Sequence, residues 1–290
     1  MKKRTARIST LTVIGVDVGG TKIAAGTVLI GKNTKLIDVI EIPIKANASA
    51  HNVFTQICTV IDFLNSKKVG AICVGFPGIV NPKSGAVLFA TNIPKFKNIP
   101  LKKWLIEKYN KKVFVQNDAK CFALGQFSTL KSKRDKNIVG LILGTGVGAG
   151  IIVNRKIVTG IDGSEGEVGA WISSSGKSFE KTLGGHDFVK QFHTPGLKLF
   201  EQAKHGDARA RKLFVSYGEH LAELIAMITV TYAPQQIILG GSVSKSAKFF
   251  LPATKKQLHA FCPDIKLPQI VVAKKKYAGV IGAAELASQE

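Results

Sequence analysis

Apolar runs separated by short glycine-rich turns mark the beginning and the middle of the chain. Residues 13–18 and 23–29 are apolar and rich in β-branched side chains, and a short Gly-Gly-Thr turn separates them. This spacing leaves no room for a helix, so it predicts a β-hairpin. The same pattern returns at 138–143 and 150–153, around the turn 144–148. The chain is therefore predicted to carry this hairpin twice, which indicates an internal duplication.

The segments that follow each hairpin alternate between short apolar strands and helices with one apolar face. Val53, Ile57 and Ile61, for example, repeat with helical spacing and predict a helix over about 50–63. Strands interleaved with helices indicate the α/β class with mixed sheets. The other expected elements are strands at 35–44, 71–75, 113–115, 236–239 and 270–272, and helices at 101–109, from 119, at 208–232, after 242 and from 279.

The length of 290 residues is enough for two modest domains or one large one. We place a change of domain near residue 118, between an N-terminal domain at 1–118 and a C-terminal domain at 119–290. The final helix is expected to pack back on the first domain.

The composition is that of a soluble globular protein, with 45% hydrophobic and 21% charged residues. An apolar run at 11–16 follows basic residues, as in a signal peptide, but Asp17 ends it without a cleavage site, and it is too short to span a membrane. The four cysteines are scattered and form no C-x-x-C pair, so neither a disulfide framework nor a zinc site is predicted. These features favour a cytoplasmic protein with no membrane partner.

The net charge of +22 is unusually high. Nucleic-acid binding is one explanation of such a charge. The lysines, however, form short clusters along the whole chain, and no RNA-binding motif or helix-turn-helix accompanies them, so we expect no nucleic-acid partner. Two explanations stay open: a solvated basic surface, and a polyanionic ligand such as polyphosphate in place of ATP.

The two glycine-rich turns are candidate phosphate-binding loops. A phosphate needs close approach to backbone N–H groups, and glycine leaves them unobstructed, while the neighbouring threonine adds a hydroxyl donor. Asp17 adds a carboxylate that can hold Mg²⁺ through its waters. Plain hairpin tips, which also favour glycine, are the alternative. The residues assigned to ATP here are Gly19, Gly20, Thr21 and Lys22 in the first turn, and Gly144, Thr145 and Gly146 in the second.

Asn117 and Asp118 lie where a predicted strand meets a predicted helix. A carboxylate at that junction can project into a cleft and deprotonate an acceptor hydroxyl, although an ordinary helix N-cap is the equal alternative. Asn92, Glu167 and Glu180 are candidates for binding sugar hydroxyls, and surface carboxylates are the alternative for the two glutamates.

Six short motifs occur together in an order that resembles the ROK family of bacterial sugar kinases and sugar-responsive repressors, within the actin and hexokinase superfamily. The resemblance spans about residues 12–288 and implies a two-domain actin-like (ribonuclease H-like) α/β fold with an interdomain cleft that closes on the substrates. The motifs lie at 15–22, 75–78, 117–119, 143–148, 166–169 and 239–243.

The resemblance also implies a role for each matching residue. Asp118 would be the catalytic base, and Gly240 and Gly241 would form the turn on the adenosine side of ATP. The sugar would be bound by Gly78, Asn92, Asn117, Asp118, Glu167 and Glu180. Where the family has a histidine this chain has Ala170, and residues 173–178 are a serine-rich run in place of its zinc-binding cysteines. We therefore expect no zinc, and the absence of the histidine leaves the choice of hexose open.

These observations predict an enzyme that uses ATP and Mg²⁺ to phosphorylate a hexose hydroxyl, with the 6-hydroxyl of glucose as the first candidate. A polyphosphate-dependent glucokinase or mannokinase, or a kinase for fructose, mannose or an N-acetylated amino sugar, are alternatives. A sugar-binding regulator is a rival, but only about a dozen residues precede the first hairpin, which leaves no room for the winged helix of the family repressors. A degenerate kinase is a second rival, against which Asp118 argues. A homodimer is also compatible with the resemblance.

Overall fold

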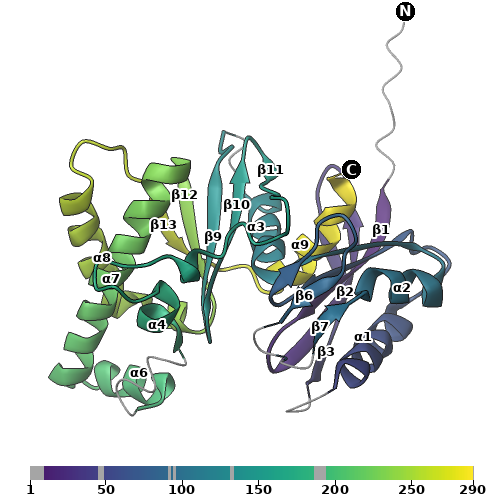
Figure 1. The fold of residues 1–290 in the computed structure, drawn as a ribbon, viewed down its shortest axis with the longest axis horizontal. Helices are drawn as coiled ribbons and strands as arrows, with labels where there is room; N and C mark the ends of the chain where they lie inside the picture. The colour runs from purple at the N-terminus through teal and green to yellow at the C-terminus, as the bar shows by residue number, and fades with distance from the viewer. Residues whose placement is uncertain are drawn as a thin grey trace, which may run out of the picture. The chain divides into compact units, whose positions relative to one another are not determined.

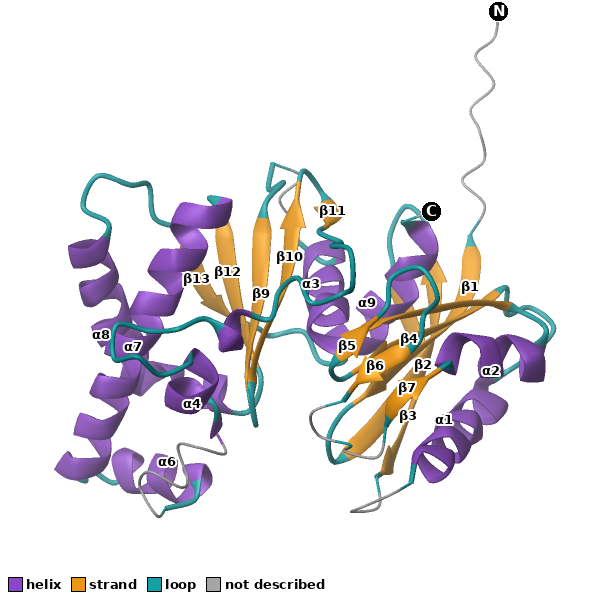
Figure 2. Cartoon of the chain, in the orientation of Figure 1, coloured by secondary structure: helices purple, strands orange, loops and turns teal. Residues whose placement is uncertain are grey.

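The computed structural model describes residues 10–44, 49–90, 93, 96–130, 134–185 and 194–289, and the chain forms two compact units (Figures 1 and 2). Unit 1 takes in the described residues of Met1–Lys131, Thr159–Glu165 and Lys275–Glu290. Unit 2 takes in those of Ser132–Val158 and Gly166–Lys274. The expected domain change near residue 118 stays a prediction; the helix that begins there belongs with unit 1.

The main sheet of unit 1 contains β1 (Leu11–Val18), β2 (Lys22–Ile30), β3 (Lys35–Pro43), β4 (Ala71–Phe76) and β8 (Lys112–Asn117). Its strand order is β3-β2-β1-β4-β8. The first three strands form an antiparallel meander, and β4 and β8 extend the sheet in parallel from β1. The predicted hairpin at 13–29 and the predicted mixed sheet are therefore confirmed.

Helices cover both faces of this sheet, and they are α1 (Ala50–Leu64), α2 (Leu101–Tyr109), α3 (Asp118–Ser128) and α9 (Ala278–Glu285), with the 3-10 turn η3 (Leu286–Ser288). Ser49 caps α1 by accepting a hydrogen bond from the N–H of Asn52. The buried face of α1, with that of α2, packs against Ile14 and Val16 of β1. On the opposite face Gly15 lies against Val280 of α9, and α9 also packs on α3.

Unit 1 also holds a small sheet that the pattern analysis missed, formed by β5 (Ile79–Val80), β6 (Val87–Phe89) and β7 (Lys97–Ile99). Its strands are antiparallel, in the order β5-β6-β7. Strands of two or three residues show no period of their own, so only the fold defines them. The sheet begins directly after Gly78. Asn92, a predicted sugar ligand, falls between β6 and β7 in the sequence.

The sheet of unit 2 repeats the plan of unit 1 and contains β9 (Ile138–Leu143), β10 (Val147–Val153), β11 (Lys156–Ile157), β12 (Gln236–Gly240) and β13 (Gln269–Val272). Its order is β11-β10-β9-β12-β13, again a meander extended by two parallel strands. The predicted duplication is thus confirmed as a repeated sheet topology. The second turn is shorter than predicted, because β10 begins at Val147 rather than Gly150.

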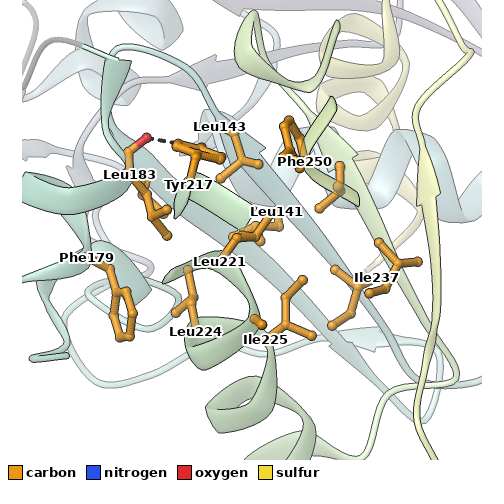
Figure 3. Close-up of a cluster of buried hydrophobic side chains, with 14 of the residues drawn as sticks. Leu141, Leu143, Phe179, Leu183, Tyr217, Leu221, Leu224, Ile225, Ile237 and Phe250 are labelled. Carbon is orange, nitrogen blue, oxygen red and sulfur yellow. Dashed lines mark hydrogen bonds between the residues drawn. The ribbon is translucent and has the colours of Figure 1, made fainter. Parts of the chain in front are cut away.

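The core of unit 2 lies between this sheet and its helices, which are α4 (Phe179–Leu183), α6 (Gly196–Lys204), α7 (Ala208–Tyr232) and α8 (Ala247–Phe261), with the 3-10 turns η1 (Val168–Ala170) and η2 (Val243–Ser246). Figure 3 shows Leu221, Leu224 and Ile225 of α7 among the strand residues Leu141 and Ile237. The hydroxyl of Tyr217 donates to the carbonyl oxygen of Leu183 (3.2 Å), which links α7 to α4.

Within the described residues, α7 is the helix long and apolar enough to cross a membrane, a test that the core helix of a soluble protein also passes. The buried residues of α7, among them Leu221, Ala222 and Ile225, belong to the core cluster of unit 2. Its apolar character is therefore explained by packing inside the unit.

Candidate active site

The first glycine hairpin joins β1 to β2 in unit 1. The backbone N–H of Gly19 donates to the carbonyl oxygen of Lys22 (2.9 Å), which closes the turn. Gly20 and Thr21 are exposed at its tip, where a phosphate can reach them. The ammonium of Lys22 lies 2.7 Å from the carboxylate of Glu41 on β3. Lys22 is exposed and its ammonium has three donors, so it can contact a phosphate as well as Glu41.

Asp17 stands one residue before the end of β1, against the first turn of α9. A Cβ atom at Gly279 would overlap the Asp17 carboxylate, so glycine is what allows this approach. Within the described residues, no hydrogen bond reaches this carboxylate. Burial, and then the charge of Asp118, raise the pKa of Asp17 to about 7, although Lys22 lowers it.

Asp118 is the first residue of α3 and follows β8 directly, so the predicted strand-to-helix junction is confirmed. Its Oδ1 accepts a hydrogen bond from the N–H of Ala119 (2.9 Å). The residue stays partly exposed, yet the loss of water around the carboxylate raises the pKa of Asp118 to about 6 against the opposing backbone hydrogen bonds. A carboxylate that is accessible and has this pKa is suited to accepting a proton near neutral pH.

Asn117 is the N-cap of α3, the role that the sequence left open as the alternative to a site residue at this junction. Its Oδ1 accepts from the N–H of Lys120 (3.1 Å), which caps α3. Its Nδ2 donates to the carbonyl oxygen of Gly78 (2.9 Å), just before β5. Unit 1 thus joins Gly78, Asn117 and Asp118 in one local assembly. Asn92, the other predicted sugar ligand of unit 1, lies outside the described residues.

The sequence reasoning missed an ion pair beside this assembly. Lys120 is only 2% exposed, and its Nζ donates to Glu165 Oε1 (2.5 Å) and to the carbonyl oxygen of Gly163 (2.9 Å). A helical lysine is normally read as solvated, and its partner lies 45 positions further along the chain. The available signal was its place among the apolar neighbours Ala119 and Cys121.

The second glycine hairpin joins β9 to β10 in unit 2. The N–H of Gly144 donates to the carbonyl oxygen of Gly146 (3.0 Å) across the turn, and Thr145 is exposed at its tip. Glu180 of α4 supports it, because Glu180 Oε2 accepts from the N–H of Val147 (2.7 Å). The structure therefore places this predicted sugar ligand at the foot of the predicted phosphate loop.

The predicted adenosine turn lies beside the second hairpin. Gly240 ends β12, and Gly241 follows it with its backbone against that of Leu143, the last residue of β9. On the other side of the hairpin, the N–H of Gly185 donates to the carbonyl oxygen of Gly144 (2.8 Å). Unit 2 thus brings together the second predicted phosphate loop and the predicted adenosine turn.

Glu167 is half-buried and directly precedes η1, which ends at the exposed residue Ala170. The N–H of Ala149 on β10 donates to the carbonyl oxygen of Gly166 (2.9 Å), so the segment that carries Glu167 is tied to the second sheet. A sugar-binding role for Glu167 stays a prediction.

The serine-rich loop that follows is held by hydrogen bonds. The Ser173 hydroxyl donates to the carbonyl oxygen of Lys177 (2.8 Å). It also lies 2.8 Å from the hydroxyl of Ser175. Glu223 of α7 accepts from the N–H of Ser174 (2.5 Å). Across the described part of the chain, no three histidine, cysteine, aspartate or glutamate side chains gather in a group that could hold a metal ion. The expected absence of zinc stays a prediction, which metal analysis of the purified protein can test.

Comparison with known proteins places this geometry in context. The model of the ROK family matches residues 13–290. A glucokinase of Thermotoga maritima is 26% identical, covering 95% of this chain and 97% of that protein. An N-acetyl-D-glucosamine kinase of Photobacterium profundum is 29% identical, covering 94% and 98%. A crystal structure of a ROK family glucokinase from Streptomyces griseus, in complex with glucose and AMPPNP, superposes with a TM-score of 0.81 at 26% identity, covering 96% of this chain and 100% of that one.

Proposed function

The chain belongs to the ROK family and is a sugar kinase, and from this premise we propose that it transfers the γ-phosphate of ATP to a hexose hydroxyl. The 6-hydroxyl of glucose is the first candidate, because glucokinases stand among its relatives. N-acetylglucosamine is the second, since kinases of that sugar are similar to the chain at comparable identity. We place the activity in the cytoplasm.

One observation carries the proposal: the accessible carboxylate of Asp118, with its pKa raised to about 6, beside an asparagine that caps the same helix. A sugar hydroxyl loses its proton as it attacks phosphorus, and Asp118 would accept it. Asn117, Gly78, Asn92, Glu167 and Glu180 would orient the sugar. The two glycine hairpins would bind the phosphates of ATP through backbone N–H groups, with Gly240 and Gly241 at the adenosine.

Asp17 fits a role in holding Mg²⁺. A carboxylate that is partly exposed, receives no hydrogen bond from the described residues and has its pKa raised to about 7 is stabilised by a nearby cation or its bound water. Bound there with ATP, Mg²⁺ would neutralise charge on the β- and γ-phosphates.

A coupled kinase assay tests the proposal. We expect turnover with ATP and Mg²⁺ on at least one sugar of a panel of glucose, mannose, fructose, N-acetylglucosamine and N-acetylmannosamine. The preferred sugar of that panel defines the substrate. Sugar binding measured by calorimetry without turnover of any of these sugars would contradict the proposal and favour a regulator or a degenerate kinase.

The phosphate donor is tested by salt, because the net charge of +22 keeps polyphosphate open. A long polyanion would engage many lysines and release many counterions, so the logarithm of its apparent affinity would fall steeply and linearly with the logarithm of salt concentration. ATP, held by a few fixed dipoles and a metal ion, would show only a shallow slope. Efficient use of polyphosphate with the steep slope, and little use of ATP, would replace the donor and leave the sugar kinase intact.

A further inference from the structure

The buried lysine of α3 stands two residues after the proposed base. Lys120 is 2% exposed and is the one buried lysine or arginine among the described residues, in a chain with 41 such side chains. An ammonium group loses much hydration when it leaves water, so its position requires strong partners.

These partners lie in the segment Thr159–Glu165, which belongs to unit 1. Lys120 Nζ donates to Glu165 Oε1 (2.5 Å) and to the Gly163 carbonyl oxygen (2.9 Å). Gly163 has a φ of +92°, and a Cβ atom there would overlap the carbonyl oxygen of Val80 on β5. At Gly163 the segment thus lies against the small sheet, and through Gly163 and Glu165 it is also tied to α3.

The same turn of α3 carries the proposed chemistry. The backbone N–H of Lys120 donates to Asn117 Oδ1, and Asn117 Nδ2 donates to the Gly78 carbonyl oxygen. Lys120 therefore holds the cap of the helix with its backbone and the segment 159–165 with its side chain. Asp118 lies between Asn117 and Lys120 in the sequence, in the first turn of the same helix.

Stability alone does not explain the pair. Glu165 Oε2 is buried without a hydrogen-bond partner, which costs free energy, and burying both charges offsets much of their attraction. Apolar residues of similar size in such a place are often neutral or stabilising. What they cannot supply is a directional link between α3 and the carbonyl oxygen of Gly163.

We propose that Lys120 and Glu165 form a positioning pair, which holds the segment 159–165 and the first turn of α3 in the arrangement that lets Asn117 and Asp118 bind the sugar. This inference rests on the proposed sugar kinase function and deepens it. The pair contacts no reacting atom and acts through these neighbours.

The double variant Lys120→Met/Glu165→Leu separates positioning from stability. The single variants Lys120→Met and Glu165→Leu each leave one buried charge unpaired and should lower Tm. The double variant should regain a Tm near that of the wild type, yet raise KM for the sugar and its calorimetric Kd about tenfold or more, as small misplacements do. KM for ATP should not change. The acid limb of kcat should also stay in place, because burial and backbone N–H groups set the pKa of Asp118.

Two further variants complete the test. Glu165→Gln keeps an acceptor for Lys120 Nζ and should keep the sugar Kd within about twofold. Lys111→Met is the matched control, because it removes a lysine hydrogen bond of 2.7 Å to the Val69 carbonyl oxygen at the far end of β8. It should leave the sugar Kd unchanged.

A double variant that is stable and has the sugar Kd of the wild type would overturn the proposal. If the double variant does not fold, a Glu165→Gln variant that folds but loses sugar affinity would overturn it too, since the hydrogen bond is kept. A wild-type protein that binds sugar but phosphorylates none would refute the kinase function, while the Kd series would still decide whether the pair positions the site.

Discussion

The two glycine hairpins occupy the same place in two sheets of the same topology, yet they are supported differently. Before the first turn stands Asp17, a partly exposed carboxylate whose pKa is raised to about 7. The second turn has no acidic residue before it and is held by backbone hydrogen bonds and by Glu180. The repeat therefore supplies the same scaffold twice, while the titrating carboxylates, Asp17 and Asp118, lie in unit 1. Under the proposed function, proton and cation chemistry would therefore fall to unit 1, while both hairpins would bind phosphate through backbone N–H groups.

Removal of the proposed base should have the largest effect. Asp118→Asn keeps the shape of the side chain but cannot accept a proton, so kcat should fall by about 10² to 10⁴ while the sugar Kd changes little. Steady-state kinetics and calorimetry measure the two quantities. The control Asp62→Asn removes an exposed carboxylate of α1 that pairs with Lys108, and it should be fully active. A kcat above about a tenth of wild type, a cost below roughly 1.4 kcal/mol, would refute the base.

Acid should inactivate the enzyme by protonating the two carboxylates of unit 1. Asp118, with a pKa of about 6, must be deprotonated to accept a proton, and Asp17, with a pKa of about 7, must be deprotonated to hold a cation. The kcat/KM for the sugar should therefore rise through pH 6 to 7 and fall about tenfold or more per pH unit below that range. A pH–rate profile at saturating ATP and Mg²⁺ measures it. Full activity at pH 5 would contradict the raised pKa of Asp118.

The two glycines of the second hairpin are expected to have different roles: Gly144 leaves room for the phosphate, and Gly146 leaves room for Glu180. A Cβ atom at Gly144 would meet only Ile142 Cγ2, at 3.9 Å, so Gly144→Ala should fold normally and raise KM for ATP about tenfold by blocking phosphate approach. At Gly146 a Cβ atom would overlap Glu180, so Gly146→Ala should also lower Tm. Thermal unfolding and ATP kinetics of the two variants check this. A wild-type KM for ATP in Gly144→Ala would show that the turn is a plain hairpin tip.

The smallest expected effect concerns stability. Because folding raises the pKa of Asp17 from 3.8 to about 7, the folded state binds the proton more tightly than the unfolded chain. The free energy of unfolding therefore falls as pH rises from about 4 to 7. Asp17→Asn removes this cost and should stabilise the protein by on the order of 1 to 3 kcal/mol at pH 8, and by almost nothing at pH 4. Denaturant unfolding at the two pH values measures the gain. A less stable variant at pH 8 would contradict the raised pKa.

Much of the fold was predictable because its signals are local. The β-branched runs gave both hairpins, and the apolar periods gave α2 and α7 with the bounds that the structure has. The small sheet β5-β6-β7 was missed because strands so short have no pattern. Asn117 and Asp118 were found because a cap and a junction are local features. The pair of Lys120 and Glu165 was not, because the apolar neighbours of Lys120 are only a weak sign of burial and its partner lies 45 positions further along the chain.

The position of α9 has a consequence for how the protein is made. All eight residues of this helix are buried, and it covers the strands β1 and β4, which are synthesised far earlier. Thr34 and Glu285, which are hydrogen-bonded, stand 251 positions apart. At about 5 to 20 residues per second, a ribosome needs on the order of ten seconds or more to cover that distance. Until then the strands β1 and β4 lack the helix α9 that packs on them. Unit 1 is therefore the first to begin synthesis but completes its fold only after the sequence of unit 2 has been translated.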